Sequence, residues 1–152
     1  MKRQIEVAIL LALGLLISGA GRPEPAWSDK PCSLQTLKGT YAYHCSGVHL
    51  GTDPQENDQP VYVAFAGKDQ YHGDGTMSGV YSFSENGVIS HNISYTGTYT
   101  VNPDCTGAFT TTDEHGVAVN ADLFFGRDGE EVYFVLTDGG VVDAAFERRV
   151  GK

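Results

Sequence analysis

Tyrosine and phenylalanine recur at alternate positions in several segments, and one histidine, His91, falls in the same pattern. Aromatic rings on one face of a strand can line a cavity for an apolar ligand, and phenols or imidazoles can orient its polar groups. A hydrogen-bonded core histidine is the simpler interpretation of His91, so no catalytic residue is assigned. The candidate ligand-binding residues of the interior are Tyr41, Tyr43, Phe65, Tyr81, Phe83, His91, Tyr95 and Tyr99.

Three cysteines could form a disulfide, bind a metal or supply a nucleophile. Their spacing does not match the paired C-x-x-C of structural zinc sites, and we expect no metal and no cofactor. Cys32 lies just before the first predicted strand and Cys105 in a turn, where the backbone can adopt bridge geometry, so we favour a disulfide between them. Cys45 lies within a strand, and alternation points His44 to the opposite face. We therefore expect Cys45 to be a buried, unreactive thiol.

No sequence motif of a known catalytic class is present. G-x-S-x-G, H-E-x-x-H and a Walker loop are all missing from the sequence. A hairpin and a solvated loop explain "HGDG" and the acidic residues at 53, 56 and 58 without a bound cation. The sequence therefore favours a protein that is not an enzyme.

Apolar and polar residues alternate from Leu37 onward, and no stretch of a dozen residues has the 3.6-residue spacing of a helix. Turns rich in Gly, Asn and Asp separate the strands at short intervals. We predict strands at about 37–47, 60–67, 76–84, 87–93, 95–101, 106–112, 117–126, 131–137 and 141–149. Short links favour an all-β fold, a single eight- to nine-stranded antiparallel up-and-down barrel, over a Greek-key sandwich.

Alternation also divides each strand into an inward and an outward row. Serine, asparagine and threonine fill the even positions from 90 to 100, and this row is expected to face water, unlike the apolar outer band of a membrane barrel. A barrel of this size is filled by side chains or holds one small ligand, and we expect a mostly filled core with a small cavity near one mouth. In the last strand Arg148 shares the parity of Val142, Ala144 and Phe146. It is predicted to point inward and to form a structural ion pair with Asp122 or Glu131.

The first residues have the features of a secretory signal peptide. Lys2 and Arg3 precede the apolar run 7–17, and small residues at 18 and 20 suit cleavage near Ala20. The run is shorter than the ~20 apolar residues that a membrane span needs, so no stable insertion of the mature chain is expected. We divide the chain into a signal peptide (1–20), an extended lead-in (21–36) and a β-barrel domain (37–152), secreted or periplasmic. The polar connection 49–60 is a candidate lid over one mouth.

The charge of the chain limits its partners. It has 10 Lys and Arg against 19 Asp and Glu, a formal net charge of −9. Nucleic acid and anionic membrane surfaces are unsuitable partners for such a protein. The expected partner is a small apolar molecule, and the oligomeric state is not indicated.

Four segments carry a resemblance to a known group: "CSLQTLKGTYAY", "GDGTMSG", "GTYTVNPDCTG" and "GEEVYFVLTDGGVVDAAFERR". Together they resemble secreted bacterial proteins of the allene oxide cyclase-like barrel, a relative in shape of lipocalins and dirigent proteins, from Cys32 to Arg149. The resemblance implies an eight-stranded antiparallel barrel and a disulfide at the positions of Cys32 and Cys105, whereas Cys45 is outside the pattern. No cyclase motif matches positions here, so no catalytic residue is transferred.

Three functions are compatible with these features. We favour a barrel that binds a small apolar or amphipathic ligand in its interior without catalysis. The alternatives are a cofactor-free isomerase or cyclase of the allene oxide cyclase-like type, using His91 and interior tyrosines, and an envelope or surface interaction protein with a filled barrel. An interior cavity larger than a few waters excludes the filled barrel, and a polar cluster inside that cavity distinguishes an enzyme from a binder.

Overall fold

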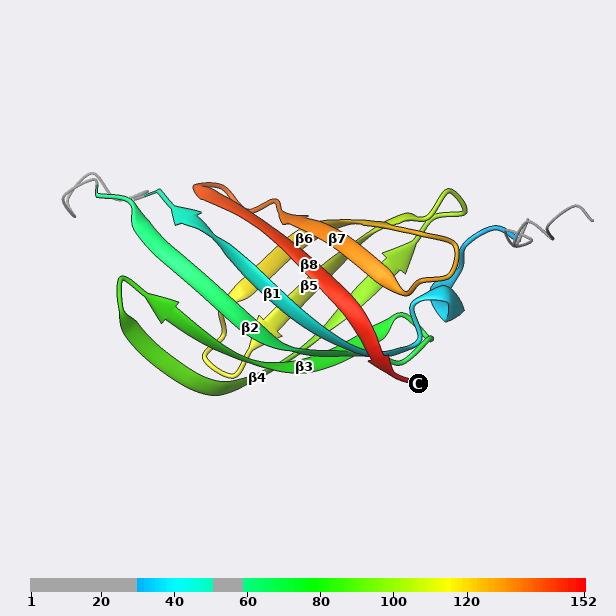
Figure 1. The fold of residues 1–152 in the computed structure, drawn as a ribbon, viewed down its shortest axis with the longest axis horizontal. Coiled ribbons are helices and arrows are strands. Elements are labelled where there is room, and N and C mark those ends of the chain that lie inside the picture. The colour runs from blue at the N-terminus through cyan, green and yellow to red at the C-terminus, as the bar shows by residue number, and fades with distance from the viewer. Residues whose placement is uncertain (1–29, 51–58) are drawn as a thin grey trace, which may run out of the picture.

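The computed structural model describes residues 30–50 and 59–152, which form an eight-stranded antiparallel barrel (Figure 1). Each strand pairs with the next, and β8 pairs with β1 to close the barrel. A short 3-10 helix, η1 (Leu34–Thr36), precedes the strands β1 (Gly39–His49), β2 (Val61–Tyr71), β3 (Thr76–Glu85), β4 (Val88–Val101), β5 (Thr106–Asp113), β6 (Ala118–Phe125), β7 (Glu131–Leu136) and β8 (Val141–Gly151). The predicted all-β up-and-down barrel is confirmed, with eight strands.

Some predicted segments lie outside the described residues. These are the signal peptide, the lead-in up to residue 29, and residues 51–58 of the candidate lid. Within the ranges 30–50 and 59–152, no helix is long and apolar enough to cross a membrane.

Strand β4 unites two segments that were predicted as separate strands, and it contains a β-bulge. Tyr81 of β3 is opposite Ile93, but Phe83 is opposite Ser90, so β4 has one extra residue at this place. Asn92 has a positive φ of 56°, a conformation that asparagine tolerates better than most residues. An inserted residue exchanges the inward and outward rows of a strand.

The bulge places His91 outside the barrel. Ile93 is buried, as predicted, but Ile89 is 60% exposed and His91 is also exposed. The prediction that His91 faces the interior is therefore wrong, because alternation was extended through a residue that breaks it.

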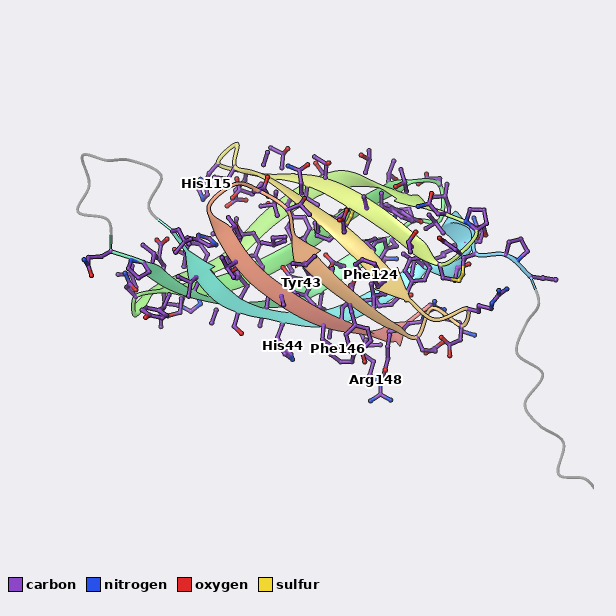
Figure 2. The ribbon with its side chains drawn as sticks, turned by 90° about the horizontal axis from the view of Figure 1, so that it is seen from above. Tyr43, His44, His115, Phe124, Phe146 and Arg148 are labelled. Atoms are coloured by element: carbon purple, nitrogen blue, oxygen red, sulfur yellow. A yellow bond between two sulfur atoms is a disulfide. The ribbon has the colours of Figure 1, made fainter. Side chains whose placement is uncertain are left out.

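The rows of β8 are also the reverse of the prediction. Four residues face inward, Asp143, Ala145, Glu147 and Arg149, and the apolar positions between them face outward. Figure 2 shows Arg148 projecting away from the barrel near Phe146. Arg148 Nε lies 3.9 Å from Glu131 Oε1, but both side chains are solvent-exposed, and Asp122 lies exposed on β6. The prediction of an inward Arg148 is wrong. The neighbouring Glu147 and Arg149 face inward instead, because they form hydrogen bonds with tyrosine hydroxyl groups inside the barrel.

Helix η1 and the disulfide close one end of the barrel. Leu37, which follows η1, is fully buried and belongs to the same core cluster as the interior tyrosines Tyr41 and Tyr99. Cys32 and Cys105 form the predicted disulfide, which links this segment to the turn between β4 and β5. The Cys32 amide also donates to the Pro103 carbonyl at 3.1 Å. We call the half of the barrel next to η1 the closed half.

Candidate ligand-binding site

A cavity of about 490 Å³ occupies the other half of the barrel, which we call the cavity half. All eight strands contribute to its walls, and it extends from Asp69 and Met77 in the middle of the barrel to His115 in the turn after β5. Its volume is within the range of small-molecule sites and exceeds the small cavity predicted from the sequence. The filled barrel that the interaction-protein hypothesis required is therefore wrong.

One wall of the cavity is made of packed aromatic rings. The Phe65 ring centroid lies 5.7 Å from that of Phe83 and 5.9 Å from that of Tyr81, and Tyr81 lies 5.8 Å from Tyr95. These separations are typical of favourable aromatic pairs. The inward rows of β2, β3 and β4 thus present a continuous aromatic surface to the cavity.

Two tyrosines lie across glycines of the neighbouring strands. A Cβ at Gly79 would lie 2.2 Å from the Tyr95 ring, and a Cβ at Gly67 would lie 2.9 Å from the Tyr43 ring. Because glycine has no side chain, each ring can lie over the neighbouring strand, and its hydroxyl group then reaches the middle of the barrel. There the two phenols lie close enough for each to affect the pKa of the other.

A buried carboxyl pair lies where the cavity meets the closed half. The Tyr95 hydroxyl donates to Asp69 Oδ1, and the Tyr71 hydroxyl donates to Glu147 Oε1 at 2.8 Å. Asp69 is 3% exposed and Glu147 is fully buried, and Asp69 lines the cavity. We call Asp69, Glu147 and these phenols the carboxyl cluster.

The two carboxyl groups differ in how readily they ionise. Burial raises the pKa of Asp69 to about 6, although hydrogen bonds from Tyr95 and Glu147 favour its ionised form. Burial and the charge of Asp69 raise the pKa of Glu147 well above its ordinary value. The pair therefore titrates as a unit, and at neutral pH it holds one proton and one negative charge, with Asp69 the more readily ionised member.

A second buried carboxylate, Asp143 of β8, lies beside the part of the cavity wall that β1 forms. Asp143 Oδ2 lies 3.0 Å from His49 Nε2, and His49 and Cys45 both line the cavity. Cys45 is a free, buried thiol, as predicted, and burial together with Asp143 raises its pKa to about 12. Across the described ranges, no three His, Cys, Asp or Glu side chains are grouped so that they could hold a metal ion.

The interior tyrosines of the closed half have different partners. Arg149 donates to the Tyr41 hydroxyl at 2.7 Å and to the Thr36 carbonyl at 2.6 Å, and Tyr41 donates to the Gly129 carbonyl at 2.5 Å. The Tyr99 hydroxyl donates to the Leu34 carbonyl at 2.9 Å. These hydroxyl groups bind the protein's own backbone and are not directed at a ligand.

The predicted residues thus separate into three groups. Five line the cavity, namely Tyr43, Phe65, Tyr81, Phe83 and Tyr95. Tyr41 and Tyr99 are inside the barrel but belong to the closed half, and His91 is on the outer surface. Asp69 and Glu147 were missed. Asp69 could have been found, because it continues the parity of Phe65, but the predicted strand stopped at residue 67.

Comparisons with known proteins identify the fold alone. No family model matches the chain, and no curated protein matches it. A de novo designed fluorescence-activating β-barrel is similar at 12% identity with a TM-score of 0.53, over 77% of this chain and 96% of that chain. A redesigned β-barrel, mFAP1, bound to DFHBI, is similar at 16% identity with a TM-score of 0.52, over 77% of this chain and 98% of that chain.

Proposed function

We propose that this protein is a binding barrel that holds one small apolar or amphipathic molecule in its cavity half. The observation that carries the proposal is the 490 Å³ cavity with its aromatic wall of Phe65, Tyr81 and Phe83. The two similar designed barrels support it, because one is described as fluorescence-activating and the other has a small molecule bound. Binding in such a site gains affinity from burial of apolar surface.

A matched pair of substitutions tests this proposal. Thr111→Phe places a ring in the cavity, whereas Thr112→Phe places the same ring on the outer face of the same strand. The neutral probe N-phenyl-1-naphthylamine should bind the unmodified protein saturably, with increased fluorescence. Thr112→Phe should retain binding and Thr111→Phe should lose most of it. Equal binding by both variants, or none by the unmodified protein, would contradict an interior site.

The carboxyl cluster favours a second candidate function, a cofactor-free isomerase or cyclase. Asp69 lines the cavity and its pKa of about 6 suits proton transfer near neutral pH. Native mass spectrometry of protein purified from its own host should first identify a co-purifying molecule. Incubating that molecule with the protein then separates the two functions, because a binder returns it unchanged and an isomerase returns a rearranged product of equal mass.

We also propose that the chain is exported and belongs with the allene oxide cyclase-like barrels. The Cys32–Cys105 disulfide supports export, since such bridges persist in oxidising compartments. The closed eight-stranded barrel is the fold that the resemblance implies. Determining the N-terminus of the protein from periplasmic and extracellular fractions tests export, and a first residue near 21 is expected.

A further inference from the structure

The ionisable residues that line the cavity are mainly acidic. Four carboxyl groups line it, those of Asp69, Glu85, Asp113 and Asp138. The basic residues that line it are His49 and His115, and no lysine or arginine of the described chain does so. An anionic ligand would therefore meet repulsion at both ends of the cavity.

The charge of Asp69 has hydrogen-bond donors beside it but no cation. The groups that act on it from the packed strands are Tyr95 of β4, Glu147 of β8, and the nearby Tyr43 of β1 and Tyr71 of β2. None of them is positively charged. A buried carboxylate without a counter-ion is costly, and a cationic group arriving with a ligand would remove that cost.

We infer that the ligand is an amphipathic amine, whose ammonium group lies against Asp69 and whose apolar body lies along the aromatic wall of Phe65, Tyr81 and Phe83. This inference rests on the proposed function and names the ligand class for the same cavity. The Tyr95 and Tyr43 rings beside Asp69 add to the selectivity, because the faces of aromatic rings attract cations. The rest of the lining is mostly apolar and suits an uncharged body.

Three probes with one ring system and different charges test the inference. They are naphthylethylamine, naphthylethanol and naphthylacetate, titrated calorimetrically into the unmodified protein at about pH 8. We expect the amine to bind roughly tenfold more tightly than the alcohol, and the acetate to bind most weakly. Equal affinity for amine and alcohol would overturn the inference and leave the proposed function standing. Failure of all three probes, and of N-phenyl-1-naphthylamine, would overturn both.

Two substitutions distinguish the effect of Asp69 on amine affinity from the effect of the protein's overall negative charge. Asp69→Asn should reduce the amine-to-alcohol affinity ratio to about one, because the amide keeps the shape and removes the charge. Asp122→Asn removes an exposed carboxylate from the outer surface and should leave the ratio unchanged. If Asp69→Asn still binds the amine more tightly than the alcohol, another group causes the selectivity and the role inferred for Asp69 is wrong.

The unmodified protein provides a test that does not depend on folding of the variant. Because the pKa of Asp69 is about 6, lowering the pH from about 8 to about 5 should protonate it, while the amine probe stays charged. The amine-to-alcohol affinity ratio should fall over this range, and alcohol binding should change little. A ratio independent of pH would contradict a role for Asp69.

Discussion

The two halves of the barrel use the same residue types for different purposes. In the closed half, the hydroxyl groups of Tyr41 and Tyr99 bind backbone carbonyls, and Arg149 and η1 complete the packing. In the cavity half, the Tyr95 hydroxyl binds the buried carboxylate of Asp69, and the space beyond the rings of Tyr43 and Tyr95 is not filled by side chains. The comparison shows that a barrel of eight strands can be stabilised at one end and leave the other end available for a ligand.

Loss of the disulfide should have the largest effect on stability, because the bridge holds the lead-in segment against the closed half. Replacing Cys32 and Cys105 together by serine opens a connection across 73 residues, and we expect a loss of about 4 kcal/mol in the free energy of unfolding. Urea denaturation measures this loss, with Cys45→Ala as the control that keeps the bridge. A loss no larger than that of the control would show that the lead-in does not hold the closed half together.

Arg149 should have the next largest effect. Arg149→Met removes donors from the Tyr41 hydroxyl and the Thr36 carbonyl, and we expect a loss of about 2–3 kcal/mol. Arg148→Met is the matched control, because its contact with Glu131 is exposed and should contribute less than about 0.5 kcal/mol. Thermal denaturation of the two variants compares adjacent residues on opposite faces of β8. Equal losses would contradict the inward row described for this strand.

The sequence predicted the parts of the barrel whose inward rows are apolar. The inward positions predicted for Tyr41, Tyr43 and Cys45 of β1 and for Tyr81 and Phe83 of β3 are correct, since hydrophobic burial alone determines which face is inside. The disulfide was also predictable, because Cys32 and Cys105 are placed where the backbone can adjust.

The same reasoning failed where burial depends on polar partners or on a local irregularity. Glu147 and Arg149 are inside because Tyr71 and Tyr41 bind them, and no pattern of hydrophobicity contains that information. The bulge at Asn92 moved His91 to the outer surface, and a single inserted residue leaves the sequence around it looking regular. The candidate site was therefore found as a set of rings, and its charged group was missed.

A substitution at Gly79 should affect the cavity half by a smaller amount. The Cβ of Gly79→Ala would lie 2.2 Å from the Tyr95 ring and 2.6 Å from the Lys68 carbonyl, so both the ring and the backbone must shift beside Asp69. We expect a loss of about 1–2 kcal/mol and weaker binding of the amine probe. Gly139→Ala is the control, since a Cβ there meets no atom within 4 Å. Unchanged probe binding by Gly79→Ala would show that Tyr95 need not stay over the glycine for the site to function.

The smallest effect expected is on Cys45, which lies on the cavity wall but should remain almost unreactive. Its pKa of about 12, caused by burial and the negative charge of Asp143, leaves very little thiolate at pH 8. Iodoacetamide should therefore modify the folded protein at least about a hundredfold more slowly than the urea-unfolded protein, which supplies one reactive thiol per chain. Asp143→Asn removes one of the two causes and should accelerate the reaction modestly. Rapid modification of the folded protein would instead mean that water and the reagent reach this wall freely, which would contradict the burial of Cys45.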